Sequence, residues 1–252
     1  MAATPYIVTR GIVLRQTETR EADKILTLLT AELGRIPVIA RGARRKSCRF
    51  AAAAQELAYA EWTLYRKGDW YYANEGETLA LFPGLRADFS RLALACYFAE
   101  LTEAVTGEGE TAAPMLSHLL NALYALDTLH KPETAVKAAF ELRAMCLAGY
   151  EPLADACAVC GRPEPEEPVL DAAEGIVRCS RCGVGAALPL CADSLAALRH
   201  ILYGDPKRLY SFSLEGPALS RLARAAESYA SAQLERGFRT LDYYKSVTNG
   251  AI

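Results

Sequence analysis

The sequence predicts an α+β protein in which a five-stranded β-barrel over residues 1–82 precedes a helical domain over residues 83–252. Three observations lead to this expectation. Apolar and polar residues alternate as in strands up to Phe82-Pro83-Gly84. Beyond that point, apolar residues recur about every 3.6 positions, as on one face of a helix. Finally, two Cys-x-x-Cys pairs interrupt the helical pattern and define a module at about 155–190.

Five strands are expected in the first domain, at residues 6–15, 24–30, 35–40, 55–66 and 70–74. β-Branched residues fill the first strand. Turns at Glu32-Leu33-Gly34 and at Lys67-Gly68-Asp69 join the second strand to the third and the fourth to the fifth. A long basic connection separates the third strand from the fourth. Five short strands with such a connection favour a small closed barrel of the OB type.

Helices are expected after residue 84 and on both sides of the cysteine module. The expected caps or first residues are Ser90, Ala113, Pro132, Asp193 or Ser194, and Ser213 or Pro217. Glycines end three of these helices, at Gly107, Gly149 and Gly237. Because helices flank the module, we expect it to hold the helical domain together rather than to act as a free recognition finger.

The cysteine module contains the most specific motif in the chain. Cys157-Ala-Val-Cys160 is followed by eighteen residues and then by Cys179-Ser-Arg-Cys182. This spacing is typical of a four-cysteine zinc site, so we expect one structural Zn²⁺ per chain. The alternatives are a disulfide pair or a redox-active Cys-x-x-Cys motif. Cys191 lies close enough in sequence to be a spare ligand.

Zinc catalysis is disfavoured by the same residues. Four thiolates fill a tetrahedral zinc site and leave no position for water or substrate. The three histidines, His118, His130 and His200, lie far apart and outside the motifs of zinc proteases and deaminases. These residues therefore argue against a zinc hydrolase or deaminase.

Composition and charge place the protein among ordinary water-soluble chains, with 52% apolar and 23% charged residues. The first residues lack the pattern of a signal peptide, and no apolar run approaches the roughly 20 residues that span a bilayer. We expect a cytoplasmic protein. The net charge of -2 is unevenly distributed: residues 1–80 hold 12 basic and 9 acidic residues, and the remainder holds 16 and 21. A polyanionic partner should therefore prefer the N-terminal third.

A basic stretch is the strongest candidate for binding such a partner. Residues 41–49 contain five basic residues and no acidic one: Arg41, Arg44, Arg45, Lys46 and Arg49. In a loop between barrel strands, these side chains can neutralise nucleic-acid phosphates. The alternative is a solvated basic loop without a ligand. Nearby aromatic residues could stack on single-stranded bases or could simply pack within the barrel: Tyr59, Tyr65, Trp70, Tyr71 and Tyr72.

Short motifs along most of the chain are shared with one family. They are Gly11-Ile-Val-Leu-Arg15, the run from Asp23-Lys24 to Thr30, Gly34-Arg35-Ile36, the run from Ala40-Arg41 to Arg45, and Leu147-Ala-Gly149-Tyr150-Glu-Pro152 ahead of the first cysteine pair. In this combination, the chain resembles the RecO family of bacterial DNA repair and recombination proteins. The sequence Arg239-Thr-Leu241-Asp242 departs from the basic stretch expected near the end of that family.

The resemblance implies an OB-fold domain, a helical domain that carries the metal, and no enzyme activity. It implies binding of single- and double-stranded DNA, annealing of complementary strands, and assistance to RecA in replacing single-strand binding protein. RecR and the acidic C-terminal tail of single-strand binding protein are the implied partners, and the nucleoid is the implied location. DNA contact is carried over to Lys24, Arg35, Arg41, Arg44 and Arg45, and the basic stretch adds Lys46 and Arg49. The alternative function is a zinc-containing protein-interaction adaptor whose DNA binding is incidental.

Overall fold

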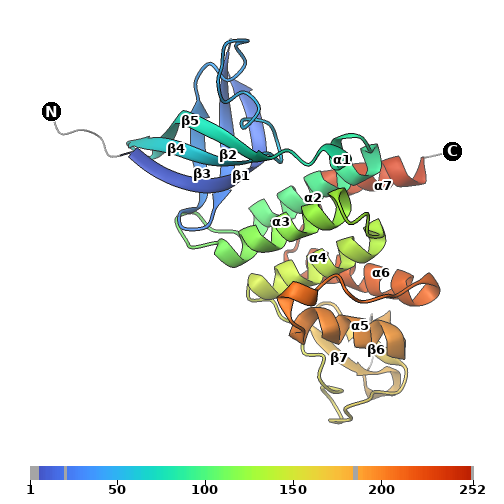
Figure 1. Ribbon diagram of the computed structural model, residues 1–252. Coiled ribbons are helices and arrows are strands. Elements are labelled where there is room, and N and C mark those ends of the chain that lie inside the picture. Colours follow the sequence, from blue (N-terminus) through green and yellow to red (C-terminus); the bar gives the residue numbers. More distant parts are fainter. Residues whose placement is uncertain (1–5, 20–21, 184–186, 251–252) are drawn as a thin grey trace. The chain divides into compact units, whose positions relative to one another are not determined.

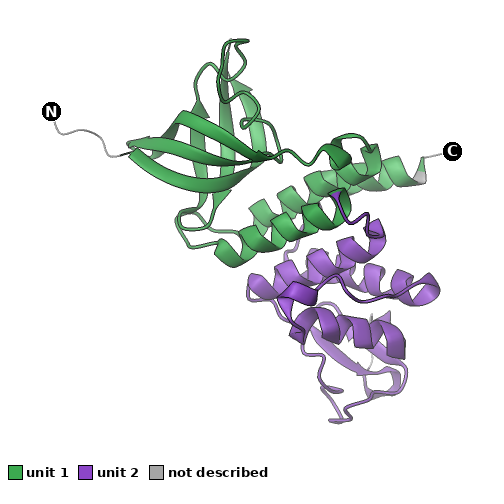
Figure 2. Cartoon of the chain, viewed as in Figure 1, with its two compact units in different colours: residues 1–127, 239–252 green, residues 128–238 purple. Residues whose placement is uncertain are grey.

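The computed structural model describes residues 6–19, 22–183 and 187–250. They form an α+β protein that begins with a closed five-stranded barrel, as predicted (Figure 1). The chain divides into two compact units, which Figure 2 shows in green and purple. The first unit comprises residues 1–127 and 239–252, and the second comprises residues 128–238. No helix in the described ranges is both long enough and apolar enough to cross a membrane.

The barrel consists of the first five strands in the order β1-β2-β3-β5-β4, with β4 pairing back onto β1. Their bounds are β1 (Tyr6–Thr19), β2 (Asp23–Thr30), β3 (Gly34–Ala40), β4 (Tyr59–Lys67) and β5 (Trp70–Ala80). Strands β3 and β5 pair in parallel, and the other pairs are antiparallel. This topology confirms the expected barrel, although β1 and β5 run further than the sequence pattern indicated.

The barrel core surrounds Trp62, whose side chain is fully buried between leucine and valine residues of the neighbouring strands. Gly76 on β5 makes room for this ring, because a Cβ at that position would lie 2.9 Å from Trp62 Cζ3. Small residues of the β3–β4 connection, Ala43, Ala53 and Ala54, complete the core. The connection is therefore fixed to the barrel by its apolar residues, whereas its basic residues lie outside.

Four helices belong to the same unit as the barrel: α1 (Pro83–Arg86), α2 (Phe89–Val105), α3 (Ala113–Asp127) and α7 (Arg239–Asn249). The cap of α2 is Asp88, whose carboxylate accepts hydrogen bonds from the backbone N–H groups of Ser90 and Arg91, so the expected Ser90 cap was wrong by two residues. Helix α7 was not predicted. It packs against α2 and buries Leu241 and Tyr244.

The second unit combines three long helices with a small sheet. The helices are α4 (Glu133–Leu147), α5 (Ala192–Tyr203) and α6 (Gly216–Gln233), and α4 packs against both of the others. The sheet has the order β7-β6-β8 and consists of β6 (Pro168–Asp171), β7 (Ile176–Cys179) and β8 (Leu188–Pro189). Short 3-10 turns follow at Ser180–Cys182 and Pro206–Arg208.

The segment between the barrel and α1 is short. Strand β5 ends at Ala80 and α1 begins at Pro83, but the compact units divide the chain after Asp127. A domain boundary after residue 82, with residues 1–82 binding DNA and 83–252 forming the helical domain, therefore stays a prediction.

Candidate nucleic-acid interface and metal centre

The basic connection, residues 41–58 between β3 and β4, is held in place by backbone hydrogen bonds. Gly42 adopts a positive φ of 67°, and its N–H donates to Asp23 Oδ1 at 2.8 Å. The N–H of Arg44 donates to the carbonyl of Ala22 at 3.0 Å. Because Ala22 and Asp23, at the start of β2, hold the beginning of the connection, its side chains project from a rigid scaffold.

Five of the seven predicted DNA contacts lie together on this connection and are exposed: Arg41, Arg44, Arg45, Lys46 and Arg49. Arg44 forms an ion pair with Glu18 across 3.2 Å. Among the described residues, Arg45, Lys46 and Arg49 form no ion pair. Three uncompensated cations on one loop attract a polyanion.

An open pocket of about 590 Å³ lies beside the connection. Arg41, Arg45 and Arg49 line it, together with Cys48 and Phe50. Residues 74–77 of β5, which include Glu75 and Glu77, also line it. Sequence reasoning missed these acidic lining residues, because only the barrel's closure brings β5 next to the β3–β4 connection.

The other two predicted contacts are engaged within the protein. Lys24 Nζ donates to Gln16 Oε1 at 2.6 Å and to the carbonyl of Ala54 at 3.2 Å, so it ties β2 to β1 and to the connection. Arg35 lies on β3 and faces α2. The structure therefore separates Lys24 and Arg35 from the five exposed cations.

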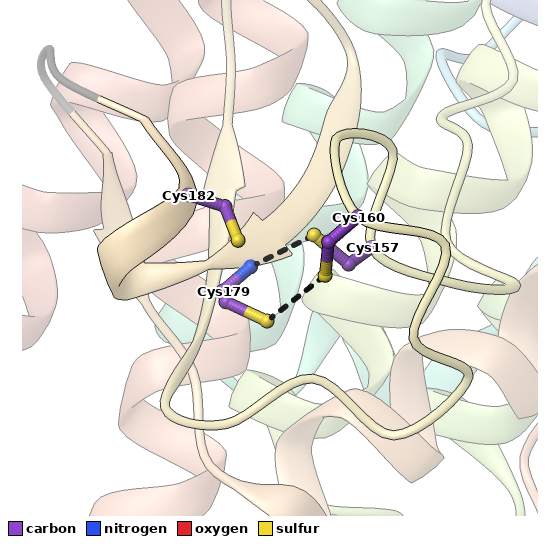
Figure 3. Close-up of side chains that lie close together, drawn as sticks. All are labelled: Cys157, Cys160, Cys179 and Cys182. Atoms are coloured by element: carbon purple, nitrogen blue, oxygen red, sulfur yellow. Dashed lines mark hydrogen bonds between the residues drawn. The ribbon is translucent and has the colours of Figure 1, made fainter.

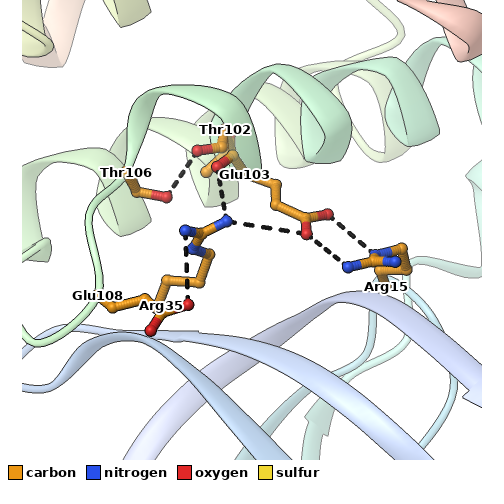
Figure 4. A network of polar contacts seen from close by, with 6 residues as sticks. All are labelled: Arg15, Arg35, Thr102, Glu103, Thr106 and Glu108. Atoms are coloured by element: carbon orange, nitrogen blue, oxygen red, sulfur yellow. Dashed lines mark hydrogen bonds and ion pairs between the residues drawn. The ribbon is translucent and has the colours of Figure 1, made fainter.

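Arg35 belongs to a network that joins the barrel to α2 (Figure 4). Its guanidinium donates to the carbonyl of Glu103 at 3.2 Å and pairs with Glu108 Oε1 at 3.7 Å. Arg15 holds the Glu103 carboxylate through two contacts of 2.8 and 3.2 Å. Such two-point arginine–carboxylate contacts fix orientation as well as charge. This network positions α2 on the barrel.

The four predicted metal ligands form one cluster (Figure 3). All Sγ atoms of Cys157, Cys160, Cys179 and Cys182 lie within 4.8 Å of one another. None of the eight cysteines, all of which lie in described residues, forms a disulfide. Four sulfurs on a sphere of about 2.3 Å around a metal would be about 3.8 Å apart, and Cys160 Sγ lies 3.9 Å from Cys179 Sγ. The cluster therefore has the dimensions to hold a metal ion.

Backbone N–H groups stabilise the thiolate of one of the four cysteines, Cys157. The N–H of Cys179 donates to Cys157 Sγ at 3.3 Å. Burial alone raises the pKa of the Cys157 thiol, but hydrogen bonds from the backbone of Cys160 and Cys179 outweigh it and lower this pKa to about 6. Gly161, which follows the first pair, has the positive φ of 71° expected of a tight turn.

The second glycine of the cluster has a different role. Gly183 is extended, with a φ of -171°, so its backbone does not require glycine. Instead, a Cβ at Gly183 would lie 2.7 Å from the Arg178 guanidinium. Arg178 in turn pairs with Asp171 across 3.4 Å, between β7 and β6. Cys191 stays outside the cluster, and its sulfur lies 3.1 Å from Ser194 Oγ at the start of α5.

Together, these features define a class of protein. A closed five-stranded barrel carries an exposed basic connection, and a helical segment carries a four-cysteine cluster that can hold a metal ion. Barrels of this kind are found in proteins that bind oligonucleotides or oligosaccharides, and four-cysteine clusters are typical of structural zinc sites.

Comparisons with known proteins identify the family. Residues 1–82 match the family described as "Recombination protein O N terminal", and residues 86–242 match "Recombination protein O C terminal". The chain therefore belongs to the RecO family of DNA repair and recombination proteins, as its motifs predicted.

Curated relatives match over nearly the whole chain. The protein named DNA repair protein RecO from Anaeromyxobacter dehalogenans (strain 2CP-C) is 39% identical over 221 residues, covering 86% of each chain. The protein of the same name from Symbiobacterium thermophilum is 32% identical over 243 residues, covering 92% of this chain and 94% of the relative. That from Acetivibrio thermocellus is 29% identical and covers 96% and 97%, respectively.

Proposed function

We propose that the protein is a non-enzymatic DNA-binding mediator that anneals complementary single strands. In this role it assists RecA in loading onto DNA coated with single-strand binding protein. The proposal also includes RecR and the acidic tail of single-strand binding protein as partners. One observation carries it: five exposed cations lie on one connection that the barrel holds rigidly, and three of them line an open pocket.

Annealing requires two polyanions to approach each other, and neutralised phosphates lower that repulsion without sequence readout. A connection with fixed ends and exposed arginine and lysine side chains supplies this chemistry. The phosphate backbone would run along residues 41–49, with Arg45, Lys46 and Arg49 available for direct contact. Glu75 and Glu77, which line the same pocket, would repel phosphates and so restrict the path of the strand.

We also propose that the metal is Zn²⁺ and that its role is structural. Four soft sulfur ligands suit Zn²⁺, and a filled tetrahedral site offers no position for a substrate. Cys157, Cys160, Cys179 and Cys182 would hold one ion per chain. The ion would join the turn after α4 to β7 and stabilise the second unit.

A second candidate function is a protein-interaction adaptor that docks partners on the cysteine module. It is favoured by two exposed apolar side chains beside the first cysteine pair, Leu153 and Val159, each 59% exposed. Under this alternative, DNA affinity would follow the module and not the basic connection.

Fluorescence anisotropy with a labelled single strand separates these candidates. The test variant reverses Arg45, Lys46 and Arg49 to Glu. A matched control reverses Lys207, Arg208 and Arg224, exposed cations of the second unit, to Glu, so that both proteins have the same net charge. The test variant should bind at least about tenfold more weakly, and its slope of log affinity against log salt should fall by roughly 1 per lost phosphate contact. Equal losses in both variants would exclude the basic connection as the DNA site.

A further inference from the structure

Three tyrosines form a row across the outer surface of the barrel. Tyr6 on β1 is paired in register with Tyr65 on β4, and Tyr65 is paired with Tyr72 on β5. Side chains along β4 point alternately into and out of the barrel. Because Leu64 points into the core, its neighbour Tyr65 points outward. The three rings, which we call the tyrosine ladder, therefore share the outer face and contribute nothing to the core around Trp62.

The rings of the ladder hold one another in place. Tyr65 and Tyr72 are stacked, with centroids 5.1 Å apart and an interplanar angle of 13°. Tyr6 meets Tyr65 edge-on at 6.3 Å and 85°. Tyr6 is 61% exposed, and its neighbour Val8 on the same face is 64% exposed. The ladder is thus a preformed aromatic surface that is open to solvent at its β1 end.

The ladder is continuous with the basic connection. Arg41 Cζ lies 5.0 Å from the centroid of the Tyr72 ring, in a cation–π contact. The same arginine lines the pocket that Arg45 and Arg49 line. Arg41 therefore links a row of cations to a row of aromatic rings, so that phosphates and bases of one strand can be bound side by side.

We propose that the tyrosine ladder is a base-stacking platform for single-stranded DNA. This proposal rests on the proposed function and extends it. Every base has a π-face, so aromatic rings beside a cationic groove bind single strands without sequence preference. In a duplex, those faces are covered by neighbouring base pairs, whereas the phosphates remain accessible. The ladder would therefore give the protein a preference for unpaired strands, while the basic connection would bind phosphates of either form.

The test compares two labelled oligonucleotides of equal length, one of thymidines and one of abasic sites, which carry the same phosphates. The first variant replaces Tyr6, Tyr65 and Tyr72 with Leu, which keeps apolar bulk on the strands but removes the rings. The second replaces all three with Phe, which keeps the rings. A control replaces Tyr124 and Tyr243, exposed tyrosines on α3 and α7, with Leu. Thermal melting checks that each variant is folded.

Wild type, the Phe variant and the control should bind the thymidine strand about tenfold more tightly than the abasic strand. The Leu variant should bind both strands equally, with an unchanged salt dependence. A thymidine preference that survives in a folded Leu variant overturns the ladder proposal.

A second measurement needs no variant. A strand that contains 5-iododeoxyuridine is irradiated on the wild-type protein, and the crosslinked peptides are identified by mass spectrometry. Crosslinks to the peptides that contain Tyr65 or Tyr72 support the platform, and crosslinks confined to other peptides overturn it. If wild type binds neither strand, the proposed function fails as well. If it binds both equally and with salt dependence, only the ladder proposal fails.

Discussion

The basic connection and the cysteine module both contain several arginines, yet these arginines differ in whether a carboxylate pairs with them. Residues 41–49 contain no acidic residue, and within this stretch only Arg44 forms an ion pair among the described residues, with Glu18. In and around the module, each arginine has a nearby carboxylate: Arg162 and Arg181 pair with Glu166, Arg178 with Asp171, and Arg199 with Glu164. The difference shows that a nearby carboxylate partner, and not the residue type, separates a structural arginine from one that is available to a ligand.

This contrast predicts that the largest loss of stability follows from breaking the metal centre. Cys157→Ser should release the metal and lower the melting temperature of the second unit, because structural zinc contributes on the order of 10 kcal/mol to the folding of small modules. DNA affinity should be kept. The measurements are calorimetry and metal content. Cys191→Ser is the control and should retain the metal, since serine also caps a helix well.

A smaller but still large effect is expected at a buried charge of the second unit. Lys137 Nζ lies 2.8 Å from both Glu141 and Glu227. Lys137→Met should cost about 3 kcal/mol, because it leaves two carboxylates without this cation in a buried site. Chemical denaturation measures the loss. Restoration of stability in Lys137→Arg would show that the charge matters; equal losses in both variants would point to packing instead.

The pH dependence of this site has a definite sign. Burial lowers the pKa of Lys137, but Glu141 and Glu227 outweigh burial and raise it above its ordinary value. A raised lysine pKa means that the contribution to stability is complete at neutral pH. The difference in stability between wild type and Lys137→Met should therefore be constant around neutrality and shrink only as the pH rises through the raised pKa.

A moderate effect on stability is expected at Arg35. This residue lies on the barrel, but carboxylates pair with it as they do with the arginines of the cysteine module. Arg35→Met should destabilise the first unit by about 1–2 kcal/mol, since it removes charged hydrogen bonds to α2. The slope of DNA affinity against salt should not change. A reduced slope in the folded variant would return Arg35 to the DNA contacts that the sequence predicted.

The smallest effect on stability is expected in the basic connection itself. Reversing Arg45, Lys46 and Arg49 to Glu should change the free energy of unfolding by less than about 0.5 kcal/mol per site, because these exposed side chains form no ion pair within the described residues. Thermal melting of the triple variant provides the check, and a large loss would mean that the connection is structural.

Much of this architecture could be predicted from local sequence. The alternation around Trp62 and the glycine turns fixed the hairpins of the barrel, and the cysteine spacing identified the cluster. Other features depend on partners distant in sequence. Helix α7 is amphipathic but polar on average, and it forms where Leu241 and Tyr244 can pack against α2. Strands β6 and β7 have four residues each, too few for a clear periodic pattern.

The candidate sites show the same limit. A sequence shows that Arg35 and Arg45 are both basic. It does not show that Arg35 pairs with Glu103 and Glu108, whereas Arg45 forms no ion pair among the described residues. Likewise, Tyr65 and Tyr72 belong to the predicted aromatic set, whereas Tyr6 joins them only through the pairing of β1 with β4. The sequence does not show the register in which the strands of the closed barrel pair, and this register brings the three tyrosines together.

The central claim is that DNA binding resides in the basic connection and that the metal centre supports the fold. The most direct test measures the salt dependence of single-strand affinity for two folded proteins, the Arg45, Lys46 and Arg49 to Glu variant and Cys157→Ser. We predict a reduced slope and weak binding for the first, and wild-type slope and affinity for the second at a temperature where it remains folded. A folded Cys157→Ser protein that has lost DNA affinity, beside a charge-reversed connection that still binds, would contradict the account.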